Sequence, residues 1–219
     1  LITAILAIVY TWVGGIKAVI WTDVLQFFVF FFGGILVLFL VANSCGDFSS
    51  LYTLASEAGK TKWFDPSLSP ALDRTLISAG FAYAVLEIAI RGCDQQFVQR
   101  YLSCKSPAAA NASSILSMLL GALISVLFYW VGAALFVYYQ IKKVESLPSG
   151  IGQNDVFPHF IVNALPSGVT GLIVAAICAA AMSSLSSAIN SLSNTTENDL
   201  LLADTSSVKS LRRAKIWTV

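Results

Sequence analysis

The sequence predicts an all-α membrane protein, a multi-helix transmembrane bundle, because of its composition and the length of its apolar runs. Of its 219 residues, 57% are hydrophobic and 11% are charged, and the mean hydropathy is +0.77. A soluble domain carries about 25% charged residues. The apolar runs are about 20 residues long, which is the length of a helix that crosses a bilayer. They do not show the alternation that marks membrane strands of about ten residues.

The charge balance and the cysteines argue against several other classes of protein. The net charge is +1, so we expect no binding to nucleic acid. The four cysteines are scattered, and Cys93 and Cys178 lie in or beside apolar segments, so we expect no disulfide framework. We find no nucleophile–base pair, phosphate loop or metal-type cluster in the sequence, and we therefore expect no enzyme activity.

The apolar segments indicate a single transmembrane domain over residues 1–219. We expect spans at residues 1–13, 18–42, 76–102, 113–139 and 168–193, and the start of another at 212–219. Gly14 and Gly15 begin a short turn, and polar loops occupy residues 43–75 and 140–168. The chain begins with Leu and its last residues start an apolar run, so we expect a fragment that is truncated at both ends.

The lysine and arginine residues predict the orientation of the spans. Eight of the 13 lie in one set of alternate loops and in the tail, and five lie in the other set. Cytoplasmic loops carry an excess of positive charge. We therefore assign the first set to the cytoplasm and place loops 43–75 and 140–168 outside. The expected protein is a multi-pass protein of the plasma (inner) membrane, in contact with the lipid bilayer.

A polar stripe marks the helix predicted over residues 175–194, AAICAAAMSSLSSAINSLSN. Ser183, Ser187, Asn190 and Asn194 are spaced i, i+4, i+7 and i+11, which places them on one face of a helix. A helix in lipid satisfies its own backbone, so these side chains must meet a neighbouring helix, water or an ion. The spacing leaves two interpretations open, namely close packing of small residues and an ion site.

Ionisable residues within the spans are further candidates. Asp23 lies near the cytoplasmic end of its span, where it either faces water or binds a cation. Glu87 and Arg91 are four residues apart, so they form an intrahelical ion pair or line a polar substrate pocket. Gly92 is the expected break point of their helix. We expect His159, the only histidine, to be structural.

Three runs of the sequence together resemble the sodium:solute symporter family, which includes the sodium/glucose, sialic acid, proline and iodide transporters. The runs are GGIKAVIWTDVLQ at 14–26, DQQFVQRYLSCKS at 94–106 and AAAMSSLSSAINS at 179–191. They follow the family's order and are spaced across nearly the whole chain. The resemblance implies the LeuT-type fold of two five-helix inverted repeats. This chain would cover the end of the fourth core helix through the eighth and touch the ninth.

The resemblance also implies sodium sites. The family's common site uses oxygens of the first and eighth core helices, and the first-helix half lies outside this chain. Its matching positions on the eighth helix are Ala180, through its backbone carbonyl, and the hydroxyls of Ser183 and Ser184. Some members bind an additional sodium between the fifth and eighth helices. The matching positions for that site are Asp23, Ser183, Ser186 and Ser187. Sodium is therefore the expected coupling ion.

The substrate positions match the family less well. Sugar-carrying members have an Asn and an aromatic gate on the sixth helix, where this chain has Glu87, Ala89, Ile90 and Arg91. This difference argues against a sugar and leaves Glu87 and Arg91 as candidate contacts for a zwitterion, an amine or a carboxylate. The implied function is sodium-coupled symport of a small organic solute. A transporter-like sensory module of a signalling protein, a passive channel and an inactive truncated fragment remain as alternatives.

Overall fold

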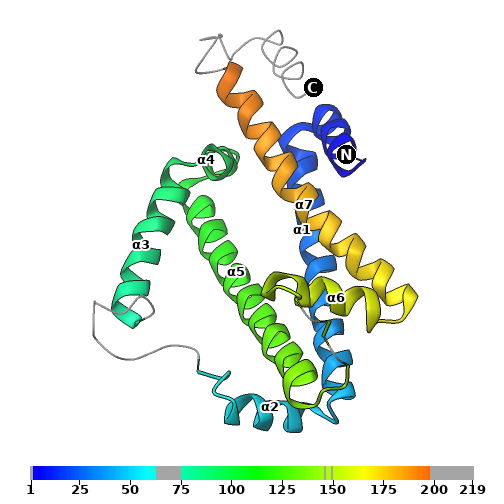
Figure 1. Cartoon of the computed structure of the whole chain (residues 1–219). Helices are drawn as coiled ribbons and strands as arrows, with labels where there is room; N and C mark the ends of the chain where they lie inside the picture. Colours follow the sequence, from blue (N-terminus) through cyan, green and yellow to red (C-terminus); the bar gives the residue numbers. More distant parts are fainter. Residues whose placement is uncertain (1, 63–74, 146, 149, 198–219) are drawn as a thin grey trace. The chain divides into compact units, whose positions relative to one another are not determined.

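The computed structural model describes residues 2–62, 75–145, 147–148 and 150–197, which fold into helices joined by short loops. The elements in Figure 1 are α1 (Ile2–Ser44), α2 (Phe48–Glu57), α3 (Leu76–Cys93), α4 (Gln95–Leu102), α5 (Pro107–Phe136), the π-helical turn η1 (Val137–Ile141), the 3-10 turn η2 (Gln153–Asp155), α6 (Val156–Asn163) and α7 (Ser167–Thr195). Within the described residues, three helical segments are long and apolar enough to cross a membrane, namely α1, α5 with η1, and α7. The expected span at 212–219 lies outside the described residues.

The chain divides into two compact units, and the long helices run from one unit into the other. Unit 1 takes the described residues within 1–30, 91–113 and 174–219, and unit 2 takes those within 31–90 and 114–173. The first two thirds of α1, all of α4 and most of α7 therefore belong to unit 1.

The helix α1 is interrupted at Gly15, within the turn that the sequence predicts. The backbone of Gly15 has φ 56° and ψ −154°, a conformation that side chains with a Cβ rarely adopt. Space is not the constraint, because a Cβ built at Gly15 would meet no other atom within 4 Å. The segments on either side of Gly15 are therefore two helices joined at a kink.

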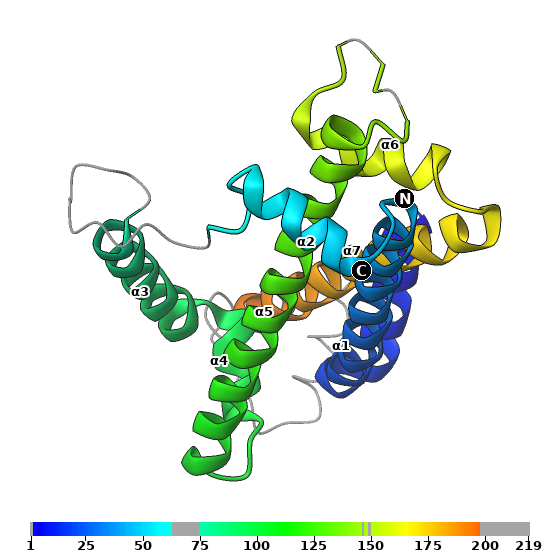
Figure 2. The ribbon, with the colours of Figure 1, turned by 90° about the horizontal axis from the view of Figure 1, so that it is seen from below.

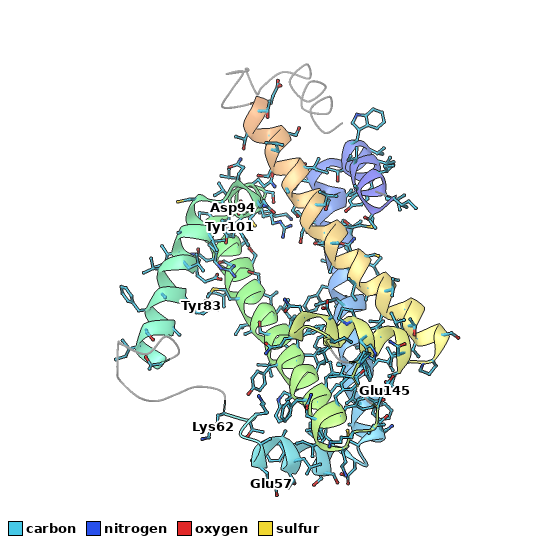
Figure 3. The ribbon with its side chains drawn as sticks, in the orientation of Figure 1. Glu57, Lys62, Tyr83, Asp94, Tyr101 and Glu145 are labelled. Atoms are coloured by element: carbon cyan, nitrogen blue, oxygen red, sulfur yellow. The ribbon has the colours of Figure 1, made fainter. Side chains whose placement is uncertain are left out.

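The predicted span at 76–102 consists of two helices. The first, α3, ends at Cys93, and Asp94 then caps α4: its Oδ1 accepts a hydrogen bond from the Gln96 amide at 2.8 Å. An Asp in this position satisfies one of the backbone N–H groups that lack a partner at a helix start. The break therefore lies two residues beyond Gly92, the break point expected from the sequence. Figure 3 labels Asp94 and Tyr101 close together at α4.

Unit 2 has an apolar core formed by the end of α1, by α2, α5, η1 and α6, and by the start of α7. Gly34 allows α1 to lie close to α5, because a Cβ at Gly34 would come within 2.8 Å of the Leu127 side chain. The ring of Tyr52 stacks on that of Trp130 with centroids 5.8 Å apart, and Figure 2 shows α2 lying across α5. The fully buried members of this core include Val37, Val41, Leu51 and Val137.

The histidine lies at the edge of this core. The Tyr139 hydroxyl and His159 Nδ1 are 3.1 Å apart and hydrogen-bonded, and their rings meet edge to face. These contacts fit the structural role that the sequence predicts for His159.

Candidate cation site

Unit 1 places the carboxylate of Asp23, on α1, against the serine stripe of α7. The hydroxyl of Ser183 donates a hydrogen bond to Asp23 Oδ1 at 2.5 Å. The Asp23 side chain is 15% exposed, so most of its surface is removed from solvent. A second contact nearby joins the same two helices, because the Tyr10 hydroxyl donates to the Met182 carbonyl at 3.3 Å. The stripe therefore meets a neighbouring helix through a carboxylate.

A third helix contributes Arg100 to the same cluster. Its Nη2 lies 2.6 Å from Asp23 Oδ2 and donates a second hydrogen bond to Ser187 Oγ at 2.7 Å. One nitrogen of α4 is therefore held between a carboxylate of α1 and a hydroxyl of α7. Sequence reasoning did not place Arg100 in the site. The one available signal was its position in the run 94–106, which carries part of the family resemblance.

Gln99, the residue before Arg100, joins α4 by hydrogen bonds to the two asparagines of the stripe. Gln99 is buried, with 6% of its surface exposed. Its Oε1 accepts hydrogen bonds from Asn190 Nδ2 at 2.8 Å and from Asn194 Nδ2 at 3.3 Å. Each stripe residue therefore has a polar partner: Ser183 bonds to Asp23, Ser187 to Arg100, and the two asparagines to Gln99.

The other predicted ligands on α7 bond to their own helix. Ser186 is fully buried, and its hydroxyl donates to the Ser183 carbonyl at 3.0 Å. Ser184 is exposed, and its hydroxyl donates to the Ala180 carbonyl at 3.4 Å. The structure thus brings Asp23, Ser183 and Ser187 into one hydrogen-bonded network, which Ser186 joins through the backbone of Ser183.

The two candidate substrate residues lie one turn apart on α3. Glu87 is half-buried, and the Arg91 guanidinium lies over the ring of Phe97, 5.3 Å from its centroid. A cation over an aromatic face is attracted by the ring quadrupole. Their role as substrate contacts stays a prediction.

The chemistry of the Asp23 cluster suits a positive charge. Carboxylate and hydroxyl oxygens are hard ligands, which small hard cations prefer. The cluster already accommodates a cation, since the guanidinium of Arg100 is bonded to Asp23 and Ser187. The side chains of this cluster are therefore compatible with the binding of a sodium ion.

Comparison with known proteins identifies the family. The model of the sodium:solute symporter family matches residues 1–216. This chain belongs to that family. The resemblance read from the three sequence runs is thereby confirmed.

The family relatives include transporters of several solutes. A sodium/sialic acid symporter of Proteus mirabilis is 37% identical over 205 residues, which are 90% of this chain and 40% of that protein. A sodium-dependent multivitamin transporter of Oryctolagus cuniculus is 30% identical over 206 residues, 90% of this chain and 31% of that protein. The chain therefore spans less than half the length of these relatives.

A solved structure of a symporter confirms the all-α membrane fold. It is a substrate-bound outward-open state of a Na⁺-coupled sialic acid symporter, and it reveals a novel Na⁺ site in that protein. The TM-score is 0.83 and the sequence identity is 33%, over 98% of this chain and 46% of that one. The multi-helix transmembrane architecture predicted from composition is thus shared with a symporter of this family.

Proposed function

We propose that this chain is part of a secondary active symporter that couples the inward movement of sodium to that of a small organic solute. The observation that carries the proposal is the hydrogen bond between Asp23 and Ser183, which sets a carboxylate of α1 against the hydroxyl stripe of α7. Membership of the sodium:solute symporter family supports the same conclusion. We place the protein in the plasma (inner) membrane as a multi-pass protein.

We assign the sodium ligands to two sites that share one residue. The additional site would use the Asp23 carboxylate and the hydroxyls of Ser183, Ser186 and Ser187. The common site would use the Ala180 carbonyl and the hydroxyls of Ser183 and Ser184, with its other half supplied by the first core helix, outside this chain. Because Ser183 contributes to both, an ion at one site would affect the geometry of the other.

The proposed mechanism depends on differential binding to two states. Sodium entering from outside holds α7 against α1 and favours the outward-open state. Binding of the solute then permits occlusion and opening to the inside, where sodium leaves. Sodium and the solute are coupled because each of them binds one of the two conformational states more tightly than it binds the other state.

We propose a carboxylate-bearing solute as the substrate. The names of the relatives mention sialic acid and monocarboxylates, and both carry a carboxylate. Arg91 supplies a positive charge at the end of α3, and Glu87 lies one turn before it. Arg91 would bind the carboxylate of the solute, and Glu87 would accept a hydrogen bond from an amine or hydroxyl. The absence of the aromatic gate from the matching positions argues against a simple sugar.

The test is uptake by the full-length protein in proteoliposomes with an imposed inward sodium gradient. Pools of labelled sialic acids, monocarboxylates, amino acids and sugars are screened, with potassium replacing sodium as the control. We expect accumulation of a carboxylate pool above its outside concentration in sodium alone. Equal uptake in both salts would indicate a channel or uniporter. No uptake in either salt, from well-folded protein, would favour a sensory module or an inactive fragment.

A further inference from the structure

We infer that Arg100 is a tethered cation that competes with sodium for the Asp23 site and so lowers the sodium affinity of that site. The inference rests on the proposed second sodium site and adds a regulatory residue to it. In this view the Arg100 side chain of α4 occupies the site whenever sodium is not bound there.

The geometry supports competition because Arg100 binds the same oxygens that sodium would use. Its Nη2 contacts Asp23 Oδ2 at 2.6 Å and Ser187 Oγ at 2.7 Å. Both oxygens are among the proposed ligands of the additional sodium. The Arg100 nitrogen bonds both the carboxylate and the hydroxyl. It therefore lies between the two oxygens, where a bound sodium ion would lie.

Two positive charges cannot occupy this position together. The guanidinium of Arg100 does not lose its proton in proteins, so its charge is removed from the site only if the side chain moves. Its side chain is 37% exposed, whereas that of Asp23 is 15% exposed. The described residues therefore enclose the Arg100 side chain less than that of Asp23, so Arg100 is the partner with more room to move.

The neighbouring residue keeps α4 docked while Arg100 moves. Gln99 is buried and bonded to Asn190 and Asn194 of α7, and none of these bonds involves the guanidinium. A long flexible side chain can thus leave the site by rotation about its own bonds, with its helix still in place. Its tether keeps its effective concentration high, so it returns when sodium leaves.

The consequence is a lower apparent affinity for sodium. A ligand whose site is available for only a fraction of the time binds with its affinity reduced by that fraction. If the guanidinium occupies the site for about nine-tenths of the time, removal of the guanidinium raises the apparent sodium affinity about tenfold.

The first experiment measures equilibrium binding of radioactive sodium to the purified full-length protein, with Arg100→Gln as the variant. We expect the concentration of sodium that half-saturates the second site to fall about tenfold. Lys105→Gln removes the same charge from an exposed position nearby and should leave sodium binding unchanged. Weaker or unchanged sodium binding in Arg100→Gln would overturn the inference, because it would show that Arg100 supports the site or has no part in it.

A second variant separates this inference from the proposed site itself. Asp23→Asn removes the carboxylate, so it should abolish the second phase of sodium binding while Arg100 is intact. If Asp23→Asn leaves sodium binding unchanged, the proposed second site fails. If Asp23→Asn abolishes the second phase and Arg100→Gln does not strengthen it, the site stands and only the competition fails.

A measurement on the unmutated protein covers the case in which Arg100→Gln does not fold. Phenylglyoxal modifies accessible arginines, and mass spectrometry gives the extent of modification at Arg100. We expect sodium to increase this modification relative to potassium, because sodium displaces the guanidinium into solvent. Equal or reduced modification in sodium would overturn the inference.

Discussion

At the scale of single residues, Asp23 depends on partners from two other helices. An unpaired carboxylate within a membrane-spanning helix is costly, about 2.5–3.5 kcal/mol at the helix centre on insertion scales. The Ser183 hydroxyl bonds one oxygen of Asp23 and the Arg100 guanidinium bonds the other. Hydrogen bonds to a charged group are stronger than those between neutral groups. Both oxygens of Asp23 are therefore bonded to partners from other helices.

The substitution Asp23→Asn keeps the size of this side chain and removes its charge. We expect the sodium dependence of uptake to weaken and its Hill coefficient to fall from near two to near one. Kinetics of solute uptake against sodium concentration give the coefficient. Asp155→Asn, which changes an exposed aspartate of unit 2, is the matched control and should behave as the unmutated protein. A coefficient that stays near two in Asp23→Asn would argue against the second ion.

At the scale of elements, the short helix α4 is joined to α7 by polar contacts. A helix of eight residues is too short to be stable by itself in water, so its tertiary contacts decide its position. Gln99 accepts hydrogen bonds from Asn190 and Asn194, and Arg100 bonds to Ser187. Consecutive residues of α4 thus bind successive turns of the polar face of α7.

Removal of the Gln99 amide should loosen this attachment. Gln99→Ala removes the acceptor of the Asn190 and Asn194 amides, which are partly buried, so we expect a cost of about 0.5–1.5 kcal/mol, the net contribution of a typical hydrogen bond. We expect a lower melting temperature of the purified protein, measured in detergent. Gln96→Ala, on the same helix, is the comparison and should melt close to the unmutated protein. Equal melting temperatures for the two variants would show that the amide contacts do not hold α4.

The kink of α1 gives a second prediction at this scale. Gly15→Ala places a Cβ on a residue with φ 56°, which costs about 1–3 kcal/mol in a sparsely populated backbone region. We expect a corresponding loss of thermal stability. Gly171→Ala is the matched control, because Gly171 lies within α7 with no atom within 4 Å of an added Cβ, and alanine favours a helix. If Gly15→Ala is as stable as Gly171→Ala, the backbone at residue 15 does not require glycine.

At the scale of the whole molecule, the proposed symport mechanism makes the number of coupled sodium ions the limit on how far the solute is concentrated. A tenfold sodium gradient supplies about 1.4 kcal/mol for each ion. With the membrane potential held at zero, one ion therefore supports about tenfold accumulation of the solute, and two ions support about hundredfold accumulation. Across about 100 mV each ion adds about 2.3 kcal/mol.

Steady-state accumulation in proteoliposomes tests this limit. With a tenfold sodium gradient and the potential held at zero, we expect accumulation above tenfold for the unmutated full-length protein. We expect Asp23→Asn to stay at or below about tenfold, because one coupling ion remains. Identical plateaus above tenfold for both proteins would show that Asp23 does not bind a transported ion.

The sequence alone determined the membrane class, the helical architecture and the family. The length of an apolar run is a local property, and so is the spacing that places Ser183, Ser187, Asn190 and Asn194 on one face of a helix. The Gly14–Gly15 turn could also be predicted from the sequence, since the conformational freedom of glycine favours an interruption of a helix.

The family resemblance already pairs Asp23 with the polar stripe, but only the tertiary structure decided that α4 also faces it. Spacing along a chain shows which side chains share a face, but it does not show which distant segment meets that face. Arg100 lies 77 residues from Asp23 and 87 from Ser187, and no local pattern joins them. By contrast, the break at Asp94 instead of Gly92 follows from a local capping bond, since Asp94 accepts from the amide of Gln96, and an aspartate at a helix start is a signal that the sequence already contains. A buried carboxylate needs a charged or hydrogen-bonding partner, and the fold decides that Arg100 and Ser183 supply it.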